Sequence, residues 1–433
     1  MSSELVSLIP RPQSAASWQL SREIAIQSTE TVLDPSQQRV VDHDSGALLV
    51  LAGPGTGKTT TLAEAVAARL TGPGALAPRE VLVLTFARKA AGELRERIIA
   101  RVGGSEVPAV STFHSLALSI VREYDTEALG PIRLLSGPEQ EMQVREILGS
   151  IVDEVLVTEK VNWPSTLSQA LSTRGLTVEI RNALARAQSL GIGAAELLAA
   201  AHRHNEPEWV AVAHVLEEYL DVIEQQSALD YNELIGRAVT LTAERREQAD
   251  LQRRYRAIYV DEYQDTDPQQ IELLKNLAAP GCIVVAVGDP DQSIYGFRGA
   301  DSRAVRKFHE DFAYLGADVS VLNTTRRFGH VIRDAAYRVI ERNPLGDMPL
   351  EVARMHRNLN TTAREDGVVE FTNYESAEVE AEEVAERIRE LVATTRSSAT
   401  PLRFRDFAIL VRSGSVSMPA LERALRNADI PVE

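Results

Sequence analysis

The chain has 433 residues, of which 44% are hydrophobic and 25% charged, and its formal net charge is −16. This acidity argues against a protein that coats nucleic acid nonspecifically, because counterion release needs clustered Lys and Arg, so any nucleic-acid contact must be a local groove. No run approaches the about 18–20 apolar residues of a membrane span, no secretory signal opens the chain, and the single Cys282 cannot form an internal disulfide. These features exclude a membrane role and predict a cytoplasmic location.

The residues before Leu33 predict a loosely ordered arm, and five apolar runs then predict strands. The runs are Ala47–Leu51, Val81–Thr85, Ala109–Thr112, Ala257–Val260 and Ile283–Val287. Helical stretches separate them, which is the alternation of an α/β domain with a parallel sheet. Between Ser115 and about Tyr255 the pattern becomes wholly helical, which predicts a helical insertion.

A second α/β unit is expected to start near Val319 and to include an acidic helix and the strand Phe407–Val411. Only one helix and no further strand follow, so its sheet would keep exposed edges, a liability that proteins normally avoid. We therefore expect the chain to be a fragment. The predicted segments are an arm at 1–32, a core domain at 33–118 and 233–320, a helical insertion at 119–232, and a truncated second domain at 321–433.

The run AGPGTGKT, from Ala52 to Thr59, fits a P-loop with alanine in place of the first glycine. In such a loop backbone N–H groups surround phosphate oxygens, while the lysine and a hydroxyl reach the β/γ-phosphates and Mg²⁺. A tight glycine turn without a ligand is disfavoured, because the loop joins a buried strand to an amphipathic helix. The candidate nucleotide-binding residues here are Ala52, Gly53, Pro54, Gly55, Thr56, Gly57, Lys58, Thr59 and Thr60.

The run DEYQD places Asp261 and Glu262 directly after a buried strand. The carboxyl ends of parallel strands are where α/β sheets bind ligands. One carboxylate can hold Mg²⁺ and the other can polarise water, which is more plausible than a pair of solvated acids given the P-loop upstream.

A third run, VGDPDQSIYGFRGA, joins a strand end to Gln292, two aromatics (Tyr295 and Phe297) and Arg298. Aromatic rings flanked by cations suit sequence-tolerant stacking on bases. On spacing alone, packing of the same rings against the sheet is the favoured interpretation. A basic run that includes Arg88 and Arg97 follows the strand ending at Thr85 and is either a solvated face or part of a DNA contact.

In this order the segments resemble superfamily 1 DNA helicases of the UvrD/PcrA/Rep type. LDPSQQRVV is similar to the adenine-reading Q motif, AGPGTGKT to motif I, LTFARKAAGEL to motif Ia and STFHS to motif Ib. VDEYQDT is similar to motif II, VGDPDQSIYGFRGA to motif III and, more weakly, NTTRRF to motif IV. The resemblance implies a RecA-like core, ATP and Mg²⁺ as cofactors, and single-stranded DNA and duplex junctions as partners.

The resemblance also implies residue roles. Gln37 would read the adenine, Lys58 would hold the β/γ-phosphates, Thr59 and Asp261 would bind Mg²⁺, and Glu262 would activate water. Gln292 would contact the γ-phosphate, and Arg327 would reach it from the second domain. The implied DNA contacts are Phe86, Arg88, His114, Tyr295, Phe297 and Arg298. Taken alone, Phe86 could be a core aromatic and His114 a capped loop histidine.

The chain departs from the family at several motif positions. Arg326 stands where a tyrosine stacks on adenine, Phe297 replaces a tryptophan, and Arg88 replaces an asparagine of motif Ia. Arginine can still stack on a base. Motifs V and VI are absent. Within the family, the chain is most similar to the motor portion of actinobacterial helicase–nuclease subunits of the AdnA type. The similarity lies in the arm, the insertion and LVLTFARKAAGELRERI. These subunits are RecB-like, and the resemblance implies a second subunit as partner.

We therefore expect an ATP-dependent helicase or translocase on single-stranded DNA in repair or recombination, with 3′ to 5′ polarity and a nucleoid-associated cytoplasmic location implied by the resemblance. The rival interpretation is an ATP- and DNA-binding regulatory subunit without motor activity. Intact Lys58, Asp261, Glu262 and Gln292 favour the enzyme. A small-molecule kinase has no use for the aromatic and arginine cluster of the third run.

Overall fold

A computed structural model describes residues 32–432, except 104–106, 126–131, 153–162, 297–299, 302, 344, 346–347 and 364. The predicted arm, Phe297 and Arg298 thus lie outside the described residues. The chain divides into two compact units, Met1–Gly367 and Val368–Glu433.

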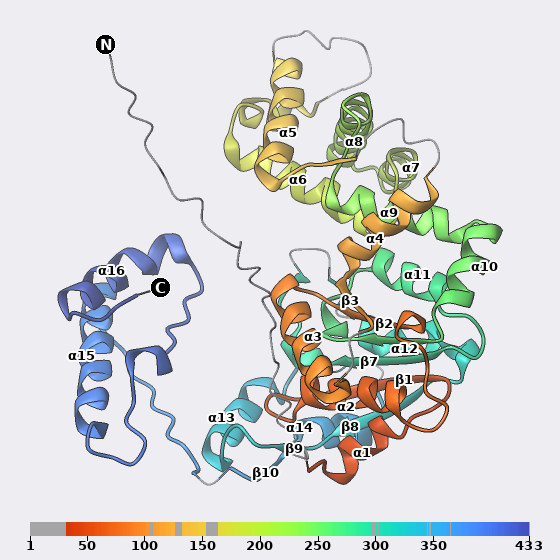
Figure 1. Cartoon of the computed structure of the whole chain (residues 1–433). Coiled ribbons are helices and arrows are strands. Elements are labelled where there is room, and N and C mark those ends of the chain that lie inside the picture. The colour runs from red at the N-terminus through yellow and green to blue at the C-terminus, as the bar shows by residue number, and fades with distance from the viewer. Residues whose placement is uncertain are drawn as a thin grey trace, which may run out of the picture. The chain divides into compact units, whose positions relative to one another are not determined.

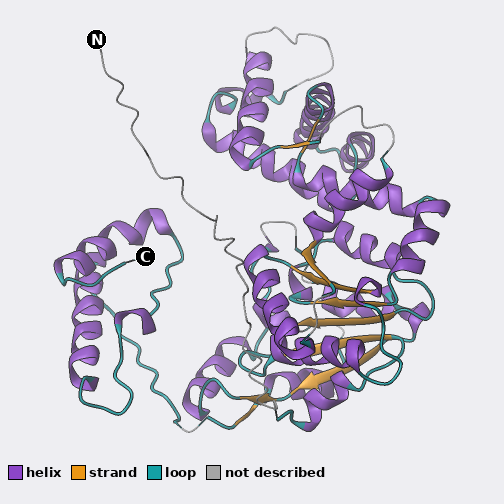
Figure 2. Cartoon of the chain, viewed as in Figure 1, coloured by secondary structure: helices purple, strands orange, loops and turns teal. Residues whose placement is uncertain are grey.

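The first unit is built on a six-stranded parallel sheet with the order β3-β2-β6-β7-β1-β8 (Figures 1 and 2). Five strands confirm the predicted runs within one residue. The strands are β1 (Ala47–Ala52), β2 (Val81–Thr85), β3 (Ala109–Thr112), β6 (Ala257–Val260), β7 (Ile283–Gly288) and β8 (Asp318–Leu322).

Both faces of this sheet are covered, which explains why its strands are continuous apolar runs. Leu49 and Leu51 of β1 face one buried cluster, whereas Leu48 and Val50 face the other, since side chains alternate along a strand. One cluster includes side chains of α4 (Phe113–Tyr124), α9 (Tyr231–Ala243), α11 (Pro268–Leu277) and α12 (Ala304–Asp311). The other includes side chains of α1 (Pro35–Val41), α2 (Lys58–Thr71) and α3 (Arg88–Val102). The helix α10 (Arg245–Arg254) links α9 to β6.

The predicted insertion has a core of its own, which Leu148, Leu184 and Tyr219 help to form. Its helices are α5 (Gly137–Val152), α6 (Arg174–Ser189), α7 (Ala194–His204) and α8 (Pro207–Gln225). The expectation that this stretch is wholly helical is wrong in one detail. Two short strands, β4 (Arg133–Leu134) and β5 (Ala228–Leu229), pair in parallel near its ends.

The expected start of a second α/β unit near Val319 is also wrong. Val319 lies in β8, which pairs in parallel with β1 and closes one edge of the main sheet. After it come β9 (Thr324–Thr325), α13 (His330–Ile340), α14 (Leu350–Arg357) and β10 (Asn360–Thr361), all within the first unit. The compact boundary therefore falls after Gly367 rather than at residue 321.

The second unit packs α15 (Ala377–Thr395) against α16 (Gly414–Asn427) through Ala381, Ile388 and Leu425. The expected strand at Phe407–Val411 is not formed: these residues, all described, follow a 3-10 turn and pair with no strand. Its apolar pattern suits a strand, but strand formation needs a neighbouring strand to pair with.

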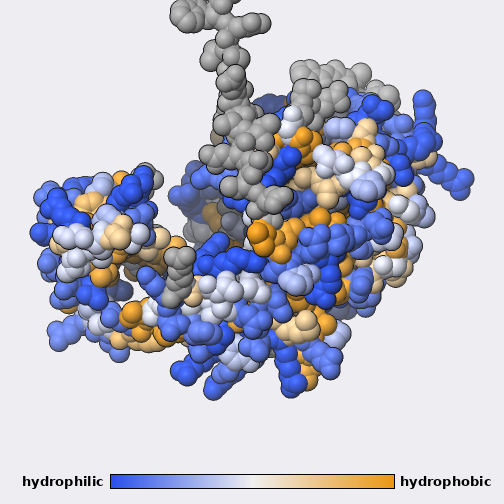
Figure 3. All heavy atoms as spheres, turned by 60° about the horizontal axis from the view of Figure 1, so that its bottom comes forward, coloured by the Kyte–Doolittle hydropathy of each residue, from blue (hydrophilic) through white to orange (hydrophobic). Residues whose placement is uncertain are grey.

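Among the described residues no helix is long and apolar enough to cross a membrane. On the face drawn in Figure 3 hydrophilic residues prevail, and apolar residues form small, separated groups. Small apolar groups of this kind are normal on protein surfaces.

Candidate nucleotide-binding site

The predicted P-loop connects β1 to α2. Gly55 and Gly57 have φ angles of +75° and +89°, a region that favours glycine. A Cβ at Gly55 would lie 2.5 Å from Cβ of Arg327, and one at Gly57 would lie 2.7 Å from Nε2 of Gln37. Gly55 is therefore required both by its own backbone and by Cβ of Arg327. At Gly57 the backbone is the reason for glycine, since Gln37 approaches it only with the far end of its side chain.

The segment after β8 is fastened to this loop. Oγ1 of Thr325 donates to the Pro54 carbonyl at 2.9 Å, and the Arg326 amide donates to the Gly55 carbonyl at 3.0 Å. Because β8 runs parallel to β1, the chain leaves both strands at the same edge of the sheet. Arg327 consequently belongs to the same compact unit as the loop, and the expectation that it arrives from a second domain is wrong.

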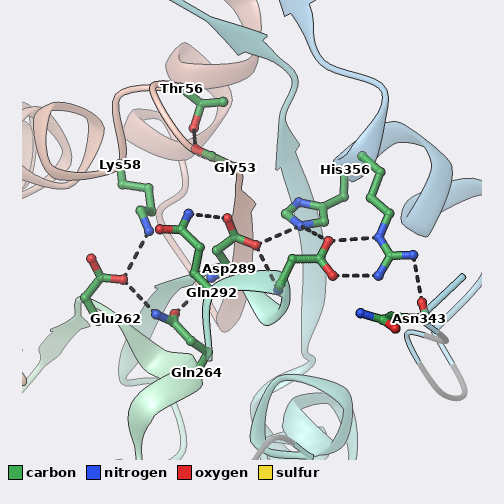
Figure 4. A network of polar contacts seen from close by, with 11 residues as sticks. Gly53, Thr56, Lys58, Glu262, Gln264, Asp289, Gln292, Asn343 and His356 are labelled. Atoms are coloured by element: carbon green, nitrogen blue, oxygen red, sulfur yellow. Dashed lines mark hydrogen bonds and ion pairs between the residues drawn. The ribbon is translucent and has the colours of Figure 1, made fainter. Parts of the chain in front are cut away.

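The acidic run lies opposite the loop lysine. Nζ of Lys58 donates to Oε2 of Glu262 at 3.1 Å, and Nε2 of Gln264 donates to the same oxygen at 2.8 Å (Figure 4). Glu262 has a left-handed backbone, with φ 53°. A strained conformation of this kind is common where a side chain must be aimed at a functional site.

Asp261 is buried at the end of β6, where its amide donates to the Leu84 carbonyl at 2.8 Å. Burial, together with the charge of Glu262, raises the pKa of Asp261 to about 6, against the opposing effect of Lys58. A buried carboxylate next to a second one is an environment that a divalent cation would stabilise. The oxygens of Asp261 and Thr59 are of the type that Mg²⁺ prefers.

These elements enclose a cleft of about 540 Å³. Its lining brings together most of the predicted nucleotide and catalytic residues, namely Gly53, Pro54, Gly55, Gly57, Lys58, Thr59, Thr60, Glu262, Gln292 and Arg327, with Arg97 and Arg326 in addition. Ala52 and Thr56 are fully buried behind it. The Thr56 hydroxyl donates to the Gly53 carbonyl at 2.8 Å, so this residue shapes the loop.

Gln37, the predicted adenine reader, holds the loop in this structure. Its Nε2 donates to the Thr56 carbonyl at 3.1 Å, and its Oε1 accepts from the amide of Asp34, which caps α1. Nη2 of Arg326 lies 2.9 Å from Oδ2 of Asp34 and 3.4 Å from Oε1 of Gln37. The Arg326 side chain therefore stays at the edge of the cleft, although it replaces an aromatic residue of the family.

The sequence predicts no role at this cleft for five residues that lie near it: Arg97, Asp289, Asp291, His356 and Arg357. Arg97 belongs to the basic run that the sequence assigns either to a solvated face or to a DNA contact, and its Nη1 lies 3.3 Å from Oγ1 of Thr60. Asp289 accepts hydrogen bonds from Gln292 and His356 (Figure 4). Arg357 pairs with Asp291. Asp289 could have been suspected from its place at the end of β7, whereas His356 and Arg357 carry no local signal.

The candidate DNA-binding aromatics meet in pairs. The rings of Phe86 and Tyr295 stack with centroids 4.8 Å apart and planes at 27°, and those of His114 and Tyr231 meet edge to face at 5.2 Å. Burial, with the nearby charge of Arg88, lowers the pKa of His114. Arg88 is exposed at the start of α3. The structure thus brings Phe86 and Tyr295 together from two different strand ends, and their role toward DNA stays a prediction.

A parallel α/β sheet with this loop, lysine and paired acids defines a P-loop protein. The model of the UvrD/REP helicase N-terminal domain matches residues 33–313, and the chain belongs to this family. It is 30% identical over 415 residues to ATP-dependent DNA helicase UvrD1 of Mycobacterium tuberculosis and 31% identical over 404 residues to ATP-dependent DNA helicase PcrA of Staphylococcus aureus. Each alignment covers 92% of this chain but 49% and 50% of those relatives, so the chain spans about half their length.

Proposed function

We propose that the chain is the ATP-binding motor portion of an ATP-dependent DNA helicase or translocase that acts on single-stranded DNA and duplex junctions. The observation that carries this proposal is the placement of Lys58 3.1 Å from Glu262 inside a cleft lined by the P-loop. Family membership supports it. In this assignment Lys58 holds the β/γ-phosphates, and Thr59 and Asp261 bind Mg²⁺, which would offset charge on the phosphates.

Glu262 would take a proton from the attacking water, Arg327 would stabilise the charge of the transferring phosphate, and Gln37 would read the adenine. The finer parts of the proposal are 3′ to 5′ polarity, a role in DNA repair or recombination, a cytoplasmic, nucleoid-associated location, and a second helicase–nuclease subunit as partner. They rest on the resemblance to UvrD/PcrA/Rep-type and AdnA-type proteins.

The test compares Lys58→Ala with Lys307→Ala, which removes an exposed lysine of α12 in the same unit. A hydrogen bond to a charged group contributes about 1.5–3 kcal/mol, so Lys58→Ala should weaken binding of Mg²⁺ with a fluorescent ATP analogue about 10- to 100-fold. Lys307→Ala should bind like the wild type. Equal binding by both variants would refute the P-loop assignment, and binding without DNA-stimulated hydrolysis in the wild type would favour the regulatory-subunit rival.

A further inference from the structure

The amide of Gln292 is held in one orientation at the wall of the cleft. Its Nε2 donates to Oδ2 of Asp289. A carboxylate can only accept, so the nitrogen of the amide must face Asp289. The amide oxygen is then turned toward Lys58, as Figure 4 shows. Gln292 therefore presents a hydrogen-bond acceptor to the cleft.

Asp289 is itself fixed by several hydrogen bonds. It is buried, its Oδ1 accepts from Nε2 of His356 at 3.1 Å and from the Asp291 amide at 3.0 Å, and its own amide donates to Oε1 of Gln264 at 2.9 Å. Burial alone would raise the pKa of Asp289, but the hydrogen bond and charge of His356, helped by Gln292, hold the pKa below its usual value. A buried carboxylate of this kind stays ionised only while such donors surround it.

His356 is the donor that comes from outside the run VGDPDQSIYGFRGA, which contains Gln292. It lies on α14, is 2% exposed, and its Nδ1 has no hydrogen-bond partner among the described residues. The polar contacts of the ring are thus made through Nε2, with Oδ2 of Asp291 at 3.7 Å as a second neighbour.

The adjacent Arg357 provides a comparison within the same helix. Its Nε donates to Oδ2 of Asp291 at 2.8 Å, and its Nη1 donates to the Asn343 carbonyl at 2.8 Å. Both side chains attach α14 to the turn after β7, but the hydrogen bond to Asp289 comes from His356. Substitution of Arg357 therefore tests anchoring of α14 alone, whereas substitution of His356 also tests the orientation of Gln292.

We propose that His356 is a positioning residue for ATP hydrolysis: its hydrogen bond to Asp289 keeps the carbonyl oxygen of Gln292, and not the amide nitrogen, facing the cleft. This inference rests on the proposed function. An acceptor at that position can orient an O–H bond of the attacking water, as phosphoryl transfer to water requires. The carbonyl oxygen of Gln292 would not bind an anionic phosphate oxygen. We therefore replace the γ-phosphate contact expected for Gln292 by a contact with the attacking water.

The variants His356→Met and His356→Gln test the inference directly. Methionine keeps the volume but has no donor, whereas the glutamine nitrogen lies the same number of bonds from the backbone as Nε2 of histidine. His356→Met should lower the turnover number of DNA-stimulated ATP hydrolysis about 10- to 100-fold through misplacement of Gln292, with the Kd for ATP unchanged. His356→Gln should recover most of the turnover. Arg357→Met should anchor α14 less well yet keep the turnover close to that of the wild type.

A double-mutant cycle separates positioning from a general structural effect. If His356 acts through Gln292, adding His356→Met to Gln292→Ala should cause no further loss of turnover, because neighbours in one network are not additive. Additive losses, or an equal loss in Arg357→Met, would overturn the inference.

A second measurement needs no turnover. In protein labelled with ¹⁵N-glutamine, the side-chain amide signals of Gln292, assigned with Gln292→Ala, should shift in His356→Met and stay in place in Arg357→Met. Unmoved signals in His356→Met overturn the inference. If the signals shift as expected but the wild-type protein hydrolyses no ATP, the result supports the role of His356 in positioning Gln292. It then refutes only ATP hydrolysis, which belongs to the proposed function.

Discussion

Nζ of Lys58 lies 3.1 Å from Oε2 of Glu262, so the loop lysine is paired with the carboxylate that we propose as general base. Gln264 holds the same oxygen from the other side, at 2.8 Å. A phosphate that takes Lys58 would therefore break this ion pair. If the proposed function is right, binding of the nucleotide would thus release the base.

Glu262→Gln should remove hydrolysis and spare binding. Glutamine keeps an oxygen that can accept from Lys58 and Gln264 but cannot take a proton, so turnover should fall about 10²- to 10⁴-fold. Nucleotide affinity should be equal or higher, because the ion pair that competes for Lys58 is weakened. Steady-state hydrolysis and equilibrium binding on the same preparation check this, and a matched loss of affinity would contradict the role given to Glu262.

Gly55→Ala should disrupt the loop far more than Gly74→Ala. Both glycines have similar left-handed backbones, with φ +75° and +72°, but a Cβ at Gly74 would meet no atom within 4 Å. The two variants thus share the penalty of a left-handed backbone. Only Gly55→Ala also pushes Thr325 and Arg327 away from the loop, which should lower the free energy of unfolding by about 1–3 kcal/mol more. Thermal unfolding and ATP binding should both show the difference. Equal effects would mean that the segment after β8 does not restrain the loop.

Asp267→Asn should stabilise the protein near neutral pH. Burial raises the pKa of Asp267 from 3.8 to about 6, although the amides of Gln270 and Gln269 and the charge of Arg186 oppose it. Between these pKa values the unfolded chain loses the proton that the folded chain keeps, so the free energy of unfolding falls as pH rises and the loss is complete above about pH 6. Asparagine can still cap α11 through the bond to the Gln270 amide.

The gain of Asp267→Asn at about pH 7 should reach at most about 3 kcal/mol and should vanish below about pH 3, where Asp267 is neutral in both the folded and the unfolded chain. Melting temperatures across this pH range measure it. Asp221→Asn, at an exposed position on α8, is the control. If the difference in melting temperature between Asp267→Asn and the wild type does not change with pH, ionisation of Asp267 is not its source.

Tyr295→Ala should weaken binding of single-stranded DNA without affecting ATP binding. Tyr295 stacks on Phe86, so the substitution removes one ring and frees the other, and each lost base stack costs about 1–3 kcal/mol. Fluorescence anisotropy with an oligonucleotide at fixed low salt measures the affinity. Trp209→Ala, which removes an exposed aromatic from α8, is the control. Unchanged affinity in the Phe86→Ala, Tyr295→Ala double variant would assign both rings to packing.

The sequence by itself determined the local elements of the nucleotide site. Buried strands are visible as apolar runs, and the P-loop and the acids after Val260 are visible because each is a short pattern attached to a strand end. The helical insertion could be predicted because its apolar residues recur at helical spacing. Its short β4–β5 pair could not be predicted, since a strand of two residues carries no periodic signal.

The tertiary structure alone decided what meets at the cleft. Pairing of parallel strands is nonlocal, so no pattern around Val319 could show that β8 joins β1 and brings Arg327 to the loop. The same holds for His356, whose partner Asp289 is 67 residues away. At Phe407–Val411 an apolar pattern forms no strand, because a strand is stabilised by hydrogen bonds to a neighbour, and the sequence of a segment does not specify whether that neighbour is present.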